Sequence, residues 1–180
     1  MRFIYVISCV LLCGVVDKVT CKFAKIMGTQ VKTEVNPNQH FMATKTPITD
    51  GQNITWYKDM PVQGFLQFAG EVQYQKGKAL KTTKLDWSAK LDLCEELGDE
   101  SFADLAGQVL RTSWLPNGSC PVHRGTTYQL RNPFPATVDL PFHVKSKQYV
   151  LNLHVGFSQS NILFSTTYEI QVLKEEESLF

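Results

Sequence analysis

Strict alternation of apolar and polar residues is the feature that most constrains the fold of this 180-residue chain. Apolar residues occupy every second position in four segments, a period that is typical of strands with one buried face. These segments span 65–74, 84–91, 149–157 and 162–172. The short link Ser158-Gln159-Ser160-Asn161 predicts a hairpin between the last two segments. Weaker strand signals lie at 23–35, 53–58, 126–131 and 138–144.

One segment follows a helical period instead. Ser101 is a favourable N-cap, and Asp104 three residues later is similar to the acidic partner of a capping box. We therefore expect a helix over 101–112. Together with the strands, it predicts an all-β, antiparallel two-sheet β-sandwich with one short helix. The apolar residues at helical spacing are Phe102, Leu105, Ala106, Val109 and Leu110.

The N-terminal segment has the pattern of a secretory signal peptide. Arg2 supplies a positive charge, and residues 3–16 form an apolar run that is too short to span a bilayer as a helix. A signal anchor or a buried helix is the alternative. We expect residues 1–21 to be removed by cleavage after Cys21, so that residues 22–180 form a single secreted, extracellular domain.

Cleavage at that position would remove three of the five cysteines and leave Cys94 and Cys120. In an oxidising compartment this even pair would form a disulfide that encloses the predicted helix. The alternative, a nucleophilic Cys94, has no supporting signature around it. The pair also lacks the C-x-x-C spacing of a zinc site, so no metal is expected. The N-x-[ST] sequons at Asn53 and Asn117 fit a secreted glycoprotein.

The charge of the chain is balanced, with 18 basic and 17 acidic residues. No domain-wide basic field is available to hold a nucleic acid by its phosphates. Catalytic motifs are absent as well, since the sequence has no G-x-S-x-G, no H-E-x-x-H and no phosphate-binding glycine loop. His154 is expected to face solvent, and Asp139 with His143 is at best a weak acid/base pair. We expect a non-enzymatic protein without a cofactor, and a secreted hydrolase assembled in space is the alternative.

A series of short motifs in the second half of the chain carries a resemblance. From Leu91 the chain has L-D-L-C-E-E-L, then the predicted helix, then Gly118-Ser119-Cys120-Pro121, Y-Q-L at 128–130, L-P at 140–141 and Y-V-L at 149–151. The order of these motifs resembles that in secreted insect proteins related to the ganglioside-activator, or ML-type, lipid-recognition proteins. These relatives include the B-type chemosensory proteins of flies.

The resemblance implies a cup-like β-sandwich in which Cys94 and Cys120 match the family disulfide. A cavity between the sheets would hold a lipid or another apolar small molecule, such as a chemosensory or pheromone-type ligand, and a membrane receptor is a conceivable further partner. The inward faces of the predicted strands supply the candidate cavity residues. They are Phe68, Val72, Leu85, Trp87, Leu91, Leu151, Leu153, Val155, Phe157, Phe164 and Tyr168.

The same apolar faces also fit a packed core, because periodicity does not distinguish a filled sandwich from a splayed one. The alternative function is therefore a secreted accessory protein with a filled core that acts through its surface on a receptor or an enzyme. Such a protein would expose a large apolar patch.

Overall fold

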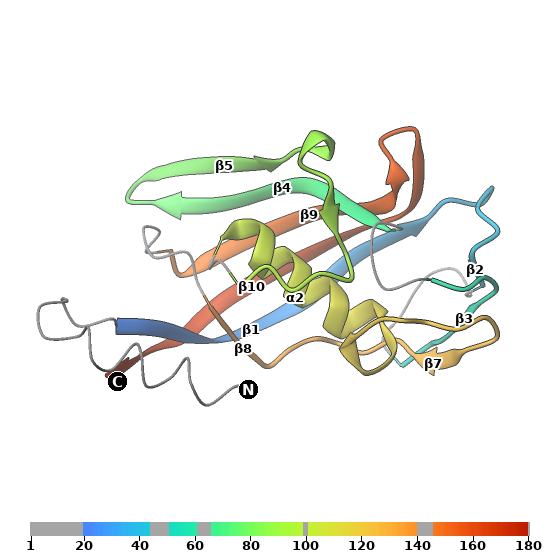
Figure 1. The fold of residues 1–180 in the computed structure, drawn as a ribbon. Helices are drawn as coiled ribbons and strands as arrows, with labels where there is room; N and C mark the ends of the chain where they lie inside the picture. Colours follow the sequence, from blue (N-terminus) through green and yellow to red (C-terminus); the bar gives the residue numbers. More distant parts are fainter. Residues whose placement is uncertain (1–19, 44–50, 61–65, 99–100, 140–145, 180) are drawn as a thin grey trace, which may run out of the picture.

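The computed structural model describes residues 20–43, 51–60, 66–98, 101–139 and 146–179. About half of them form one antiparallel sheet, with the strand order β5-β4-β9-β10-β1-β8 and with β6 paired to β4 (Figure 1). The strands of this large sheet are β1 (Thr20–Val35), β4 (Gln67–Lys76), β5 (Ala79–Leu85), β6 (Leu91–Asp92), β8 (Ala136–Asp139), β9 (Gln148–Ser158) and β10 (Asn161–Leu179). A small sheet contains β2 (Met42–Ala43), β3 (Asn53–Trp56) and β7 (Thr127–Gln129). The prediction of an all-β fold with two antiparallel sheets is confirmed.

The hairpin of β9 and β10 lies at the centre of the large sheet and confirms the alternation read from the sequence. Asn161 pairs with Ser158 beside the turn, as predicted. Along β9 every second residue is buried from Tyr149 to Val155. The weaker strand signals correspond to β1, β3, β7 and β8, and residues 140–144 of the last one lie outside the described residues.

The predicted strand over 84–91 is wrong. Its first residues end β5, and the Asp86 carboxylate then accepts a hydrogen bond from the Ser88 backbone N–H (2.8 Å) at the start of a 3-10 turn over Trp87–Ala89. This bond also holds the pKa of the Asp86 carboxyl below its usual value. Lys90 adopts a left-handed φ of 50°, after which β6 begins. A local hydrogen bond between the Asp86 side chain and the backbone thus forms in place of the hydrogen bonds that would have continued the strand.

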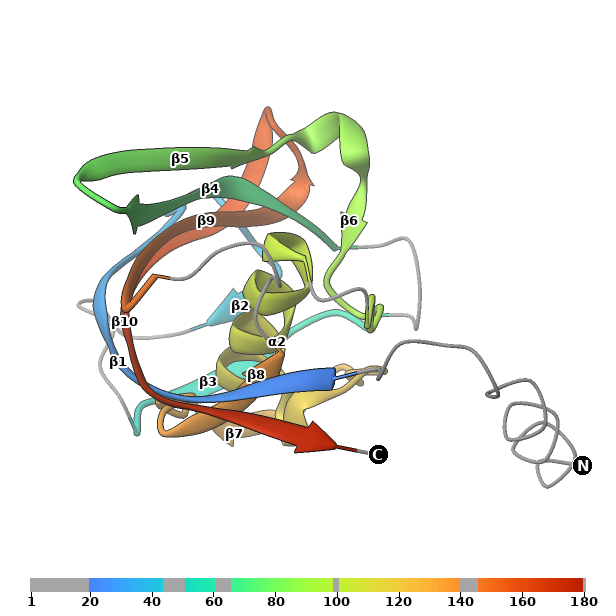
Figure 2. The same ribbon diagram turned by 90° about the vertical axis from the view of Figure 1, so that its left-hand side faces the viewer.

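The predicted helix is confirmed as α2 (Phe102–Trp114). The Asp104 backbone N–H donates a hydrogen bond to Ser101 Oγ (3.1 Å), as expected for an N-cap. Figure 2 shows the large sheet curving around α2, which lies inside the hollow of the sheet. The whole apolar stripe of the helix is therefore buried, and it consists of Phe102, Leu105, Ala106, Val109 and Leu110.

The disulfide between Cys94 and Cys120 is formed, with the two Cα atoms 5.6 Å apart. It joins the segment that enters α2 to the segment that leaves it, so the predicted helix inside a disulfide loop is confirmed. Residues 1–19 of the predicted signal peptide lie outside the described residues. Asn53 and Asn117 are both exposed, and their glycosylation stays a prediction. In the described part of the chain, no helix has the length and apolar character needed to cross a membrane.

Candidate functional site

Most of the residues predicted to line a cavity lie on the inner face of the large sheet. The space that this face encloses is occupied by α2. Leu91 and Phe157 are partly buried at the margin of the core, and Trp87 lies on the 3-10 turn outside it. The others are buried on strands of the large sheet, and they are Phe68, Val72, Leu85, Leu151, Leu153, Val155, Phe164 and Tyr168.

Aromatic contacts show how α2 fills the hollow. The Trp114 indole stacks on the Phe164 ring with a centroid distance of 3.8 Å. Its Nε1 atom donates a hydrogen bond to the Tyr168 hydroxyl (3.1 Å). Near the other end of the helix, Phe102 stacks on Tyr74 with a centroid distance of 5.0 Å. A ligand in the predicted cavity stays a prediction, and such a ligand would have to displace these side chains.

Two polar atoms inside this core, the Trp56 indole nitrogen and the Tyr128 hydroxyl, form no hydrogen bond of ordinary geometry with the described residues, although the two side chains lie close to each other. Because Tyr128 pairs with Ile54, two residues before Trp56, both side chains share one face of the small sheet. Burial raises the pKa of the Tyr128 phenol and that of Tyr168, and the Trp56 side chain opposes the shift at Tyr128. The sequence showed only weak strand signals for β3 and β7, and nothing in it indicated that the polar atoms of Trp56 and Tyr128 would be buried together.

Replacing Tyr128 with phenylalanine is expected to stabilise the protein. The change keeps the ring and removes a buried hydroxyl that forms no hydrogen bond of ordinary geometry with its neighbour Trp56, so the free energy of unfolding should rise by about 1 kcal/mol. Thermal unfolding should show this as a rise in Tm of roughly 2–4 °C. Tyr57→Phe, at a position that is 52% exposed, is the control and should leave Tm unchanged. A lower Tm for Tyr128→Phe would mean that the hydroxyl is satisfied in the folded protein.

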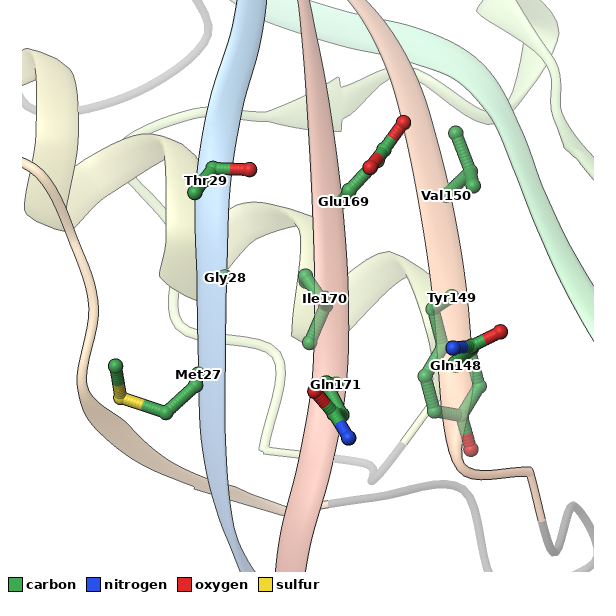
Figure 3. Close-up of a pocket in the computed structure, with 9 residues that line it drawn as sticks. All are labelled: Met27, Gly28, Thr29, Gln148, Tyr149, Val150, Glu169, Ile170 and Gln171. Carbon is green, nitrogen blue, oxygen red and sulfur yellow. The ribbon is translucent and has the colours of Figure 1, made fainter.

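A groove of about 520 Å³ hollows the surface of the large sheet on the face opposite α2 (Figure 3). It crosses β1, β10 and β9. Its two walls are rows of side chains that point away from the helix. One row is Met27, Gln171 and Gln148, and the other is Thr29, Glu169 and Val150.

The floor of the groove is the row between the two walls. Gly28 pairs with Ile170, which pairs with Tyr149, and the two side chains of this row point into the core. A Cβ atom on Gly28 would lie 2.5 Å from the Glu169 carbonyl oxygen and 2.8 Å from the Phe134 ring. Glycine is therefore required for the Phe134 ring to pack beneath the strand. The groove exists because this row directs no side chain outward.

The described histidines do not assemble a catalytic group. His154, predicted to face solvent, is half-buried, and its Nδ1 atom lies 2.7 Å from Ser165 Oγ. No carboxylate of the described residues orients its imidazole. His40 and His123 are exposed, and His143 lies outside the described residues. Within the same ranges, no group of three His, Cys, Asp or Glu side chains is placed to hold a metal ion.

A second hollow, of about 350 Å³, lies beside the buried Arg111 guanidinium on α2. Burial lowers the pKa of Arg111, while the Glu96 and Asp104 carboxylates raise it. Arg111 donates a hydrogen bond to the Glu95 carbonyl oxygen, and Gln108 Nε2 donates one to Asp104 (3.0 Å). The bond of Arg111 to Glu95 joins α2 to the segment that precedes it, and the bond of Gln108 to Asp104 lies within α2, so we assign the cluster a structural role.

No protein-family model matches the sequence, and no curated protein matches it. Among solved structures, the chain is similar to the crystal structure of chicken MD-1 complexed with lipid IVa. The similarity covers 88% of this chain and 100% of that chain, with 11% sequence identity and a TM-score of 0.26. At this identity and TM-score the similarity does not bear on function. The resemblance to the insect relatives of ganglioside-activator proteins therefore stays a prediction.

Proposed function

We propose that this chain is a secreted, non-enzymatic binding protein for a lipid or another apolar small molecule, and that the outer groove holds the ligand. The observation that carries the proposal is the groove itself. Its volume of about 520 Å³ lies within the range of roughly 300–1,000 Å³ that is usual for small-molecule sites. The disulfide between Cys94 and Cys120 supports the secreted location.

The lining of the groove suits an amphipathic molecule. Met27, which is 40% exposed, and Val150 offer apolar surface to a hydrocarbon chain. Each methylene group that leaves water there would contribute up to about 0.8 kcal/mol. Among the lining residues Glu169 carries the only charge, and Gln148 and Gln171 offer amide groups. We therefore expect a ligand with an alkyl chain and a hydrogen-bond donor, such as a long-chain amine or alcohol.

The groove is a better candidate than the interior because α2 already occupies the interior. Burial of a large apolar side chain contributes about 1.5–3 kcal/mol, so removing the helix stripe and Trp114 from the core would cost on the order of 10 kcal/mol. An alkyl chain of about twelve methylene groups would return on the order of 10 kcal/mol at the same site. Such an exchange leaves no net gain for binding.

Displacement of the fluorescent probe N-phenyl-1-naphthylamine tests the proposal. Val150→Trp should fill the groove and abolish probe binding with little change in Tm, because Val150 lies on the outer face. Val31→Trp is the matched control, since Val31 is 55% exposed and does not line the groove. Dodecylamine should displace the probe at lower concentration than dodecanoate. We expect the two displacing concentrations to differ by at most about fivefold, because a surface ion pair contributes little. Glu169→Gln should remove this preference for the amine.

Unchanged probe binding in Val150→Trp would place the site elsewhere and contradict the proposal. Three exposed side chains favour a second candidate, an accessory protein that acts through its surface. They are Met27 and Val31 on β1 and Leu173 on β10, with exposed fractions of 40%, 55% and 53%. If the wild-type protein takes up none of the probes, this second candidate is favoured.

A further inference from the structure

The hairpin between β4 and β5 carries a cluster of positive charge on a chain that is otherwise balanced. Lys76 and Ala79 close its turn, and Lys78 and Lys81 follow within the same hairpin. All three lysines are exposed. No acidic residue occurs between positions 72 and 85 of the sequence. Figure 1 shows this hairpin projecting beyond the neighbouring strands.

A fourth lysine, Lys147, joins the cluster from a distant part of the sequence. Ser146 Oγ accepts a hydrogen bond from the Gln75 backbone N–H (3.3 Å), which brings the segment before β9 beside the hairpin. Lys147 is exposed there. No carboxylate of the described residues forms a salt bridge with any of the four lysines. Glu71 faces Lys84 instead, further along the strand pair.

Leu80 lies between Lys78 and Lys81 in the sequence of the hairpin and is 71% exposed. It pairs with Gln75 on β4. Because Tyr74 packs inward against Phe102, the alternation of the strand directs Gln75 and Leu80 to the outer face of the sheet. Lys81 pairs with Tyr74, and Lys76 lies two residues after Tyr74, so these two lysines lie on the opposite face of the hairpin from Leu80. Lys76, Lys78, Leu80, Lys81 and Lys147 together are called the basic hairpin below.

We propose that the basic hairpin docks this protein on the surface of an anionic lipid bilayer. Any polyanion would attract the four lysines, but an exposed leucine at the same hairpin favours a bilayer, which offers an apolar layer beneath its phosphates. The interface of a bilayer accepts cations at the level of its phosphates and an apolar side chain just beneath them. The long alkyl stems of the lysines let their ammonium groups reach the phosphates from both faces of the hairpin. The inference does not depend on the ligand groove, which lies on β1, β10 and β9.

Co-sedimentation with phosphatidylcholine vesicles, with and without phosphatidylserine, tests the inference. The wild-type protein should bind the phosphatidylserine vesicles, and added salt should weaken the binding. One lysine near an anionic surface changes the partition coefficient about fivefold. The partition coefficient of the triple variant Lys76→Gln, Lys78→Gln, Lys81→Gln should therefore be about a hundredfold lower than that of the wild-type protein.

The matched control changes the net charge equally at three exposed lysines elsewhere, with Lys25→Gln, Lys32→Gln and Lys90→Gln. It should bind close to the wild-type level. Leu80→Ser should weaken binding severalfold, and Leu80→Trp should strengthen it, since tryptophan favours the interface. Equal losses in the two triple variants would overturn the inference. Binding to heparin beads that is lost in the hairpin variant, with unchanged vesicle binding, would also overturn it and indicate a sulfated polysaccharide.

Discussion

Replacing Leu105 with aspartate is expected to destabilise the protein by about 4 kcal/mol or more, through an unpaired charge buried between α2 and the large sheet. Leu105 is fully buried within the helix stripe. The total stability of a domain is commonly about 5–15 kcal/mol, so a large fraction of the variant should be unfolded. Chemical denaturation followed by circular dichroism measures the change.

Thr112→Asp is the matched control for this variant, because Thr112 is exposed on the same helix. It introduces the same charge and should lower the free energy of unfolding by at most about 1 kcal/mol, since Thr112 lies in the last turn of α2, where a negative charge opposes the helix dipole. Similar stabilities for the two aspartate variants would contradict the position of α2 inside the curved sheet. That result would reopen the interior as a ligand cavity.

Replacing Val155 with tryptophan is expected to cost about 3 kcal/mol or more, because the residue lies in a filled part of the core. Val155 is fully buried on β9 between Phe68 on β4 and Phe164 on β10. Both neighbours are buried, and the Trp114 indole stacks on Phe164 at a centroid distance of 3.8 Å, so we expect an indole at position 155 to overpack the core. Thermal unfolding should show a marked loss of Tm.

The same substitution at Val31 is the control and should leave Tm nearly unchanged, since Val31 is 55% exposed. The Val155 variant also separates the two possible ligand sites. Retained stability together with lost uptake of a fluorescent fatty acid would indicate an interior cavity. Lost stability would leave the outer groove as the small-molecule site.

The disulfide loop links these two predictions. α2 is the element that fills the hollow, and Cys94 and Cys120 join the chain before and after it. Arg111 adds a contact from inside the loop through its hydrogen bond to the Glu95 carbonyl oxygen. The helix is thus fastened at both ends, which supports a permanent place in the core over a role as a movable lid.

The sequence by itself determined the elements whose signals are local. The alternation over 149–157 and 162–172 predicted β9, β10 and their turn, because a side-chain period of two is a property of each strand alone. Ser101 and the spacing of the apolar residues predicted α2, because a cap and a helical face depend only on residues within a few turns. Cysteine counting predicted the disulfide.

The local signal gave a wrong prediction over 84–91, where a segment that forms a turn has the alternating pattern of a strand. Over 84–91 the alternation continued through a 3-10 turn, and the bond between Ser88 and Asp86 overrode it. The signal for such a bond was present in the sequence, since aspartate two residues before serine favours a turn. Alternation alone did not reveal it.

Only the tertiary structure decided what lies in the hollow and where the surface is open. Periodicity assigned Phe164 and Tyr168 to an inward face, but the stacking of Trp114 on this face followed from the curvature of the whole sheet. The groove combines residues 27–29, 148–150 and 169–171, and Lys147 joins a hairpin more than sixty positions away. These juxtapositions depend on the register between distant strands. Register is set by the pairing and packing of the complete sheet, and no single segment of the sequence encodes it.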